Sequence, residues 1–493
     1  MERDNTHSSY YYAACFSLQH IIVMKKWKAK DYKPLDAFIP ALLPEISGLV
    51  ENKALKPDKL RVVLHQLYMA RMIQLATHNE KGRYVFDAGW TPLNAEVLKR
   101  LIGMNYRRYI DLLIDRGIIY EKTDEKGNKS YLQNTRSSLY RINPQFLGQD
   151  KIQFRKERVV DYCTLKAIYS TREWFNRVRK PLGSRIEEIH CKLTDMLHHV
   201  EFNTVAATNY IDELLRNTHD KNVADYLTEL PELFRAINEG QVQWTKVDVF
   251  GERLHTHLTG IKKEMRNFMR FRETPDEPLL CLDICNSQPY FASVSIRENV
   301  IEQLLPEFSA CIGLVKGIEY REDYKLFAQL SADGLIYDYW QNVRNISRDE
   351  AKAEIIQKIM FGKNKTYSKP TQQAKNAFGL IFPSVSQLFY LIKRLDESSL
   401  PFIKEIYIKD NRVFAGRSAL HKNLSCMMQR AESRTMLKRI APKLIEAGIT
   451  TFLTVHDSYL ISPQHEQVVR KIVESEFRMF GVEPPKVKST LLA

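Results

Sequence analysis

The sequence predicts an α+β protein, and two observations lead to that prediction. From about residue 250 onward, short apolar runs of strand length alternate with long helical patterns, which is typical of mixed helix and sheet. Before that point helical periodicity dominates, with short extended runs between the helices. The chain has 493 residues, of which 44% are hydrophobic and 27% charged. It is therefore long enough for about three well-packed domains, and general disorder is not expected.

The amino-acid composition indicates the cellular compartment and the class of binding partner. The seven cysteines form no CxxC pair and no Cys/His pattern at zinc spacing, so we expect a cytoplasmic protein without a disulfide scaffold or structural zinc. The net charge of +14 favours a polyanionic partner. No apolar stretch is long enough for a transmembrane helix, and the apolar run 10–24 follows acidic residues, unlike a signal peptide. We therefore expect no membrane partner.

The N-terminal part begins with a mixed lead-in at residues 1–60. From Leu60 the periodicity predicts a helix, and NEKGRYVFDAGW then predicts a short hairpin around Lys81 and Gly82. Farther along, residues 151–250 are densely helical and carry charges of both signs, without a motif of their own.

Between these segments the order of elements predicts a winged helix at residues 61–150. Two short amphipathic helices are separated near Gly103, and Gly117 follows the second where a helix end favours a left-handed residue. Two extended runs then flank a charged tip that contains glycine. Helix, turn, helix and basic-tipped hairpin is the order of a winged helix.

The second of these helices is the candidate DNA-recognition helix. Arg107 and Arg108 lie near its start, where a recognition helix meets the major groove. The wing tip carries Lys122, Lys126 and Lys129. The alternative is a protein-binding or purely structural winged helix, because one fold serves many functions.

Two aspartates in the C-terminal half are candidates for metal-assisted chemistry. Asp283 ends the apolar run in LLCLDICNSQPYF, and Asp457 lies at or near the tip of a predicted hairpin in ITTFLTVHDSYLIS. They are 174 residues apart (457 − 283), each at the end of a predicted strand. Two Asp on neighbouring strands can hold two divalent ions for phosphoryl transfer. Alone, either Asp would more simply cap a turn.

Two basic segments are candidates for phosphate binding. Ser347 can cap a helix on which Arg348 and Lys352 share a face, suited to a triphosphate. The alternative is a solvated charged helix. Before the Asp283 strand, a predicted helix carries an apolar stripe and a basic stripe that suits a nucleic-acid backbone or simply faces solvent. The basic stripe consists of Lys262, Arg266 and Arg270.

Taken in order, these stretches resemble the palm and fingers of the family-A nucleic-acid polymerases. The resemblance spans about residues 250–465 and is specific only as a joint order of short motifs. GERL is similar to the family's Gly-Arg element, DICNSQPYF resembles motif A, and RDEAKAEIIQKIMFG resembles motif B. NLSCMMQRAESRTMLK is similar to the helix before motif C, and TVHDSYLI resembles motif C.

The resemblance implies roles for individual residues. Metal binding falls on Asp283 and Asp457, and catalysis falls on these two with Arg348 and Lys352. The nucleotide would be bound by Arg348, Lys352, Phe361 (followed by Gly362), Gln288 and Tyr290. Besides Arg107, Arg108 and the basic stripe, the nucleic acid would contact Arg253, Gln429 and His456. Tyr290 lies two residues after Gln288, where an aromatic ring would exclude ribonucleotides; the alternative is a buried aromatic residue.

Three departures from the family pattern bear on the interpretation. Asp283 lies four residues before Ser287, and Ser458 follows His-Asp, as in the family's RNA polymerases. Nine residues separate Lys352 from Phe361, one more than usual, which predicts a bulge or a misplaced Phe361. AKNAFGLIF offers a competing motif B centred on Lys375, but it lacks an Arg four residues earlier.

The resemblance implies a right-handed polymerase fold, with palm and fingers at 251–493 and a thumb-like region at 151–250. We expect a monomeric template-directed DNA polymerase that uses two Mg²⁺ ions, with Mn²⁺ as a substitute, and lacks proofreading. Its partners would be a DNA primer–template, nucleoside triphosphates and other replication proteins of a small replicon or mobile element. Two alternatives remain: an RNA polymerase or primase-like enzyme on the same palm, and a non-catalytic DNA-binding replication factor.

Overall fold

The computed structural model describes most of the chain, which divides into two compact units. The described ranges are 32–50, 55–76, 89–123, 131–132, 137–148, 153–179, 187–242, 244–396, 398–403 and 420–492. Unit 1 comprises Met1–Leu182, Glu201–Trp244 and Thr256–Met269, and unit 2 comprises Gly183–Val200, Thr245–His255 and Arg270–Ala493. The architecture mixes helix and sheet, as the sequence predicts.

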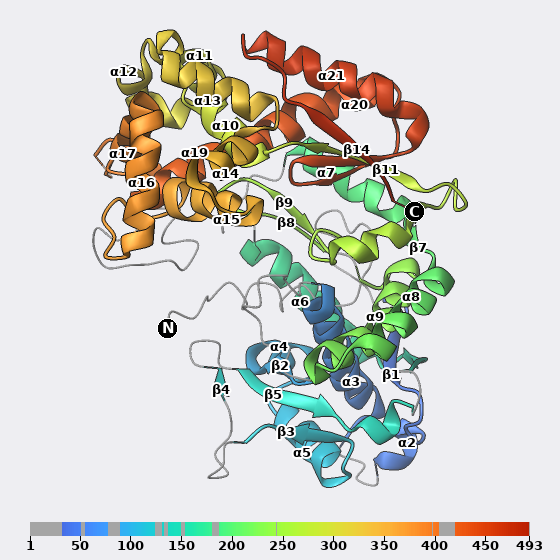
Figure 1. Cartoon of the computed structure of the whole chain (residues 1–493). Coiled ribbons are helices and arrows are strands. Elements are labelled where there is room, and N and C mark those ends of the chain that lie inside the picture. The colour runs from blue at the N-terminus through green and yellow to red at the C-terminus, as the bar shows by residue number, and fades with distance from the viewer. Residues whose placement is uncertain are drawn as a thin grey trace. The chain divides into compact units, whose positions relative to one another are not determined.

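Unit 1 is mostly helical, with short antiparallel strands (Figure 1). Its helices are α2 (Ile46–Leu49), α3 (Pro57–Ala76), α4 (Ala95–Ile102), α5 (Tyr106–Asp115), α6 (Tyr162–Arg179), α8 (Thr204–Asn217) and α9 (Lys221–Asn238). Its strands are β1 (Leu35–Pro40), β2 (Thr91–Asn94), β3 (Ile119–Glu121), β4 (Tyr131–Leu132), β5 (Ser137–Ile142) and β6 (Phe154–Val159). Three short strands fall at the unit boundaries in the sequence: β7 (Val200–Phe202), β9 (Leu254–Thr256) and β10 (Met269–Phe271).

The predicted succession of helix, turn, helix and hairpin is present in unit 1. The side chain of Asn94 accepts hydrogen bonds from Glu96 N and Val97 N and so caps α4. Gly103 (φ 98°) separates α4 from α5, and Gly117 (φ 65°) follows α5, because both positions need a left-handed backbone. Strands β2, β5 and β3 then pair in that order, all antiparallel. The hairpin expected around Lys81 and Gly82 lies outside the described residues, as do wing residues Lys126 and Lys129.

The second half of the lead-in belongs to the core of unit 1. Strand β1 pairs antiparallel with β6, from Leu35 opposite Val159 to Pro40 opposite Phe154. Helix α3 lies against β1 and buries residues around its whole circumference, because β2, α4, α5 and α9 also contact it. The apolar periodicity from Leu60 therefore marks the central helix of the unit.

His65 makes the stability of unit 1 sensitive to acid. Its Nδ1 accepts a hydrogen bond from Phe38 N (3.1 Å), and complete burial lowers its pKa to about 3. The unfolded chain should bind this proton near pH 6.5. The free energy of unfolding should therefore fall as the pH drops below about 6.5, by up to about 1.4 kcal/mol per pH unit.

Urea unfolding at pH 7 and pH 5 measures this effect. His65→Asn keeps an acceptor but does not titrate, so it should lose part of the acid sensitivity. The exposed His219 provides the control, and His219→Asn should behave as the wild type. Equal pH dependence in His65→Asn and wild type would contradict the assignment.

Unit 2 combines an antiparallel sheet with many helices (Figure 1). Its strands are β8 (Thr245–Val247), β11 (Leu279–Ile284), β12 (Leu453–Val455), β13 (Ser458–Ile461) and β14 (Val487–Leu492). Its earlier helices are α7 (Glu188–Met196), α10 (Ser287–Ser295), α11 (Glu298–Leu304), α12 (Ile312–Val315), α13 (Glu322–Ala332), α14 (Ile336–Arg344) and α15 (Arg348–Ala353). The later helices are α16 (Lys369–Ile381), α17 (Pro383–Ile392), α19 (Asn423–Ser433), α20 (Ala441–Glu446) and α21 (Glu466–Met479). None of the described helices has the length and apolar character needed to cross a bilayer.

The sheet of unit 2 has the order β12–β13–β11–β14. Along β11 the side chains alternate: Leu280, Leu282 and Ile284 are at most 6% exposed and belong to the core cluster of the unit. Asp283 lies between two of these core residues and therefore points away from that core, because successive side chains on a strand face opposite sides. The sheet thus presents Asp283 on its other face.

Candidate active site

The structure brings the two predicted aspartates to adjacent positions. Asp283 on β11 pairs with Ser458 on β13, and Ile284 N donates a hydrogen bond to the backbone oxygen of Asp457 (3.3 Å). Strands β12 and β13 form a tight hairpin in which Val455 pairs with Ser458, so Asp457 lies in the turn as predicted. The backbones of the two predicted aspartates are therefore adjacent, at the end of β11 and in the turn beside it.

His456 begins the turn and connects it to the GERL loop. Its backbone is left-handed (φ 55°), as the first position of a tight hairpin turn requires. Its ring meets that of His255 edge to face, with ring centroids 5.5 Å apart. His255 Nε2 in turn lies 3.2 Å from Asp248 Oδ2. His456 is therefore half-buried beside the two aspartates.

Asp248 organises the backbone of the GERL loop. Its carboxylate accepts hydrogen bonds from Phe250 N, Gly251 N and Arg253 N. Burial by itself would raise the pKa of Asp248, but His255 and these N–H groups hold the pKa well below its usual range. A persistently ionised Asp248 therefore fixes the loop that carries Arg253.

Glu432 is a buried carboxylate beside the aspartates that the sequence analysis missed. It is 1% exposed on α19 and forms an ion pair with Arg253 (Nη2–Oε1, 2.7 Å). Its Oε2 accepts a hydrogen bond from Gln288 Nε2 (2.7 Å). Burial raises the pKa of Glu432 to about 7, with a further contribution from the negative charge of Asp457 and opposition from Arg253. The predicted residues Arg253 and Gln288 thus meet on one carboxylate.

Gln429 lies one turn before Glu432 on α19 and packs against the same loop. A Cβ atom on Gly251 would come within 2.8 Å of Gln429 Cβ, so the approach requires glycine. The GERL loop and α19 are therefore in direct contact.

Arg348 lies against Tyr337, a buried tyrosine of α14 near Asp457. Its guanidinium carbon is 5.8 Å from the centroid of the Tyr337 ring. The pKa of Tyr337 is raised, first by burial, and is shifted in opposite directions by the charges of Arg348 and Asp457. Both charges therefore act on one phenol group. Arg348 is half-exposed and pairs with Asp338 (2.9 Å).

Lys352 follows four residues later on α15 and is exposed. Ser347 and Glu350 form the capping box at the start of this helix, which confirms the predicted N-terminus. The two predicted phosphate-binding cations therefore project from the first turns of one capped helix.

A π-helix accounts for the extra residue between Lys352 and Phe361. The segment Glu354–Met360 is π-helical, and a π-helix accommodates one more residue than an α-helix. A Cβ atom on Gly362 would come within 2.3 Å of the carbonyl oxygen of Lys358, so the chain needs glycine there. The predicted bulge is therefore present.

Lys375 of the competing motif lies on α16 and is held by backbone oxygens. Its Nζ donates to Lys363 O and Asn364 O. Phe378 and Phe382 of the same segment are buried in an aromatic cluster with Phe327. The two phenylalanines of this motif therefore serve packing, whereas Arg348 lies against Tyr337 and pairs with Asp338.

The side chain of Tyr290 lies in the core of unit 2, which favours the alternative of a buried aromatic residue over a contact with the nucleotide sugar. The residue is 1% exposed on α10, and its hydroxyl donates to Glu483 O (2.8 Å). Its ring packs edge to face against Phe477 (5.2 Å). The motif alignment placed it correctly on the helix after β11, but its side chain faces the core.

The prediction that Lys262, Arg266 and Arg270 form a basic stripe on a helix is wrong. Lys263–Phe268 is a short 3₁₀ helix, and Met269–Phe271 is a strand, so the i, i+4 spacing does not hold. Lys262 lies over the Tyr226 ring (4.9 Å), and Arg266 donates to Ile261 O and Thr259 O. Arg270 donates to Leu492 O (3.2 Å). Each cation therefore has its own intramolecular role.

Of the two arginines on the candidate recognition helix α5, one is held in ion pairs within the protein and the other is exposed to solvent. Arg107 binds Asp111 (2.7 Å), Glu121 (2.6 Å) and the hydroxyl of Tyr140 (3.2 Å). The hydrogen bonds to Glu121 raise the pKa of Arg107. Arg108 is exposed, and no described residue pairs with it. Arg107 thus ties α5 to the hairpin, which leaves Arg108 for a partner.

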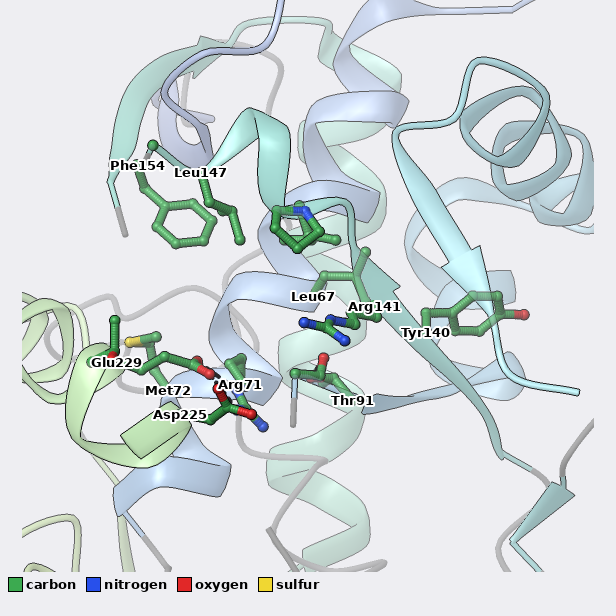
Figure 2. A pocket seen from close by; sticks show the side chains of 15 residues that line it. Leu67, Arg71, Met72, Thr91, Tyr140, Arg141, Leu147, Phe154, Asp225 and Glu229 are labelled. Atoms are coloured by element: carbon green, nitrogen blue, oxygen red, sulfur yellow. Dashed lines mark hydrogen bonds and ion pairs between the residues drawn. The ribbon is translucent and has the colours of Figure 1, made fainter. Parts of the chain in front are cut away.

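Unit 1 also contains a cavity of about 150 Å³ (Figure 2). Apolar side chains of Leu67, Met72, Leu147 and Phe154 form much of its wall. Its charged side is formed by Arg71 of α3 and by Asp225 and Glu229 of α9. Arg71 Nε donates to Glu229 Oε2 (2.6 Å), and both side chains are at most 9% exposed. The buried pair ties α3 to α9.

Asp283 and Asp457 fit a divalent-cation site. Within the described residues, no group of three or more His, Cys, Asp or Glu side chains is placed to hold a metal ion. Two carboxylates are the smaller ligand set that Mg²⁺ takes when waters and phosphate oxygens complete its shell. The donor set is therefore compatible with Mg²⁺.

Comparison with known proteins assigns no family. No protein-family model matches the chain, and no curated protein matches it. Among solved structures, the chain is similar to the polymerase domain of Pol1 from M. smegmatis in complex with DNA primer–template and dNTP. The identity is 12%, the TM-score is 0.33, and the match covers 66% of this chain and 74% of that chain.

Proposed function

We propose that the protein is a template-directed nucleotidyltransferase that extends a primer 3′ end with deoxynucleotides. The observation that supports this most is the adjacency of Asp283 on β11 and Asp457 in the β12–β13 turn, where Ile284 N donates a hydrogen bond to Asp457 O. Two carboxylates on adjacent backbone segments suit two Mg²⁺ ions, with Mn²⁺ as a substitute. The cations on α15 suit the triphosphate.

The reaction places different demands on each residue. Mg²⁺ bound by Asp283 and Asp457 would favour ionisation of the primer 3′-hydroxyl and stabilise charge on pyrophosphate. Arg348 and Lys352 would bind the phosphate oxygens, whose charge grows as the bond breaks. Arg253, which pairs with Glu432, would contact the primer–template together with Gln429 and His456.

The proposal also concerns whether the product is DNA or RNA. An RNA polymerase on the same site is a second candidate, and the burial of Tyr290 favours it because this ring faces the core and not a bound sugar. Primer extension with deoxynucleotide and ribonucleotide pools in turn separates the two. Extension with neither pool, on any primer–template, would support the non-catalytic DNA-binding factor instead.

We also propose that the helix–turn–helix and hairpin of unit 1 form a winged helix that binds duplex DNA through α5. Arg108→Ala should weaken duplex binding and reduce the salt slope by about 1, because one phosphate contact is lost. Fluorescence anisotropy at several salt concentrations measures both quantities. The control is Arg216→Ala, an exposed arginine on α8.

The companion variant Arg107→Ala separates binding from folding. It should chiefly destabilise unit 1, because it leaves the buried carboxylate of Glu121 without its ion pair. If Arg108→Ala leaves both affinity and salt slope at the wild-type values, α5 does not bind DNA and the domain has a structural or protein-binding role.

A further inference from the structure

The last strand of the described chain places a lysine beside Asp283. In the pairing of β11 with β14, Asp283 is opposite Lys488, while Ser458 is opposite Asp283 on the other side. Residues directly opposite on antiparallel strands point to the same face of the sheet. Lys488 therefore shares the face of the candidate metal ligand, although the two residues are 205 positions apart (488 − 283).

Lys486 is fixed next to the same site by its backbone. Cys285 N donates to Lys486 O (2.9 Å), and Lys486 N donates to Ala332 O (2.7 Å). The aliphatic stem of Lys486 passes over Gly334: a Cβ atom there would be 3.8 Å from Lys486 Cδ and 2.9 Å from Cys285 Cβ. The start of the lysine side chain is thus set by two backbone hydrogen bonds and a close glycine contact.

The two lysines form a cationic pair at the end of β11. Both are exposed, and within the described residues no carboxylate forms an ion pair with either. Lys488 is opposite Asp283 in the pairing of β14 with β11, and Lys486 O accepts a hydrogen bond from Cys285 N. Both lysines therefore lie at the end of the strand that carries Asp283.

The charge balance of this region favours a multiply charged anion. Among the described residues, Lys488 is opposite Asp283 on the neighbouring strand, and Arg348 of α15 pairs with Asp338. Divalent ions on the two aspartates would leave a large positive surplus. A triphosphate or pyrophosphate neutralises such a surplus and offers acceptors for ammonium donors.

We propose that Lys486 and Lys488 bind the triphosphate of the incoming nucleotide and the pyrophosphate that leaves. This inference rests on the proposed function and adds phosphate ligands from β14 to those on α15. The phosphates of the nucleotide are favoured over the backbone of the primer–template, because both lysines lie at the end of the strand that carries the candidate metal ligand Asp283.

The test is the variant Lys486→Ala/Lys488→Ala in the full chain. The matched control is Lys316→Ala/Lys471→Ala, two exposed lysines of unit 2 that no described carboxylate pairs with. Steady-state primer extension gives KM for the nucleotide, calorimetry gives the Kd of magnesium pyrophosphate, and anisotropy gives the Kd of the primer–template. We expect the first two to rise by about tenfold or more and the third to stay unchanged, since each lost contact is a charge-assisted hydrogen bond. Lys486→Arg/Lys488→Arg should retain most of the affinity.

The outcomes separate this proposal from the proposed function. A weaker primer–template complex with an unchanged nucleotide KM would overturn it and assign the lysines to the nucleic-acid backbone. If the wild type extends primers and the double variant has wild-type KM and pyrophosphate Kd, the lysine site is wrong and the polymerase stands. If the wild type extends no primer but binds magnesium pyrophosphate, and the double variant binds it tenfold more weakly, the anion site stands and the polymerase fails.

Discussion

Asp283→Asn and Asp457→Asn should each reduce nucleotide addition by at least about 10³-fold, because metal-ion stabilisation of the transition state amounts to several kcal/mol. Binding of the primer–template should persist, since neither carboxylate contacts the nucleic acid directly in the proposed mechanism. Single-turnover primer extension measures the first quantity, and anisotropy measures the second.

The double variant and a control sharpen this result. Asp283→Asn combined with Asp457→Asn should be little worse than either single change, because residues that act as one unit are not additive. Asp396→Asn, an exposed aspartate of unit 2, should keep wild-type activity. If either single variant retained even a tenth of the wild-type rate, the paired metal site would be wrong.

Arg71→Met should lower the free energy of unfolding of unit 1 by about 3–5 kcal/mol, because it leaves Glu229 as an uncompensated buried charge. The double variant Arg71→Met/Glu229→Leu removes both charges and should recover much of that loss. Urea unfolding measures both.

Lys99→Ala is the matched control, because Lys99 pairs with Glu96 on the surface of the same unit. Exposed ion pairs of this kind contribute little to the free energy of unfolding. A double variant as unstable as Arg71→Met alone would show that packing, rather than the unpaired charge, causes the loss.

The parts of the structure that local sequence determines were predictable. The hairpin at Asp457 follows from two apolar runs around a polar turn, and the break between α4 and α5 follows from Gly103, whose φ is 98°. The one-residue excess before Phe361 is visible in the spacing, and the π-helix accommodates it. In each case the determining residues are close together in the chain.

Features that depend on distant contacts were not predictable. Glu432 is held by Arg253, 179 residues away, and nothing in its local sequence marks it as buried. Lys488 reaches Asp283 only through the pairing of β14 with β11. A signal did exist in the alternating lysines of PPKVKST, which a strand would place on one face.

The helical stripe and the sugar contact of Tyr290 both depended on an assumed side-chain orientation. The stripe of Lys262, Arg266 and Arg270 presumes 3.6 residues per turn, but Arg266 lies in a 3₁₀ helix and Arg270 in a strand. Tyr290 lies on the expected helix, yet Phe477 and Glu483 draw its side chain into the core. Motif order fixes where a residue occurs, whereas packing partners fix where its side chain points.

The π-helix has an evolutionary consequence through Lys393. The buried ammonium of Lys393 donates to Ile359 O (2.5 Å) and Gly362 O (3.0 Å), and burial lowers its pKa to about 7. These carbonyls end the widened helix, where backbone oxygens lack helical partners. Burying the ammonium of Lys393 without these carbonyl acceptors would destabilise the fold. Without the lysine, the two carbonyl oxygens would lack a hydrogen-bond donor. The inserted residue and the lysine are therefore expected to be epistatic, so that a lineage losing one would come under selection to lose the other.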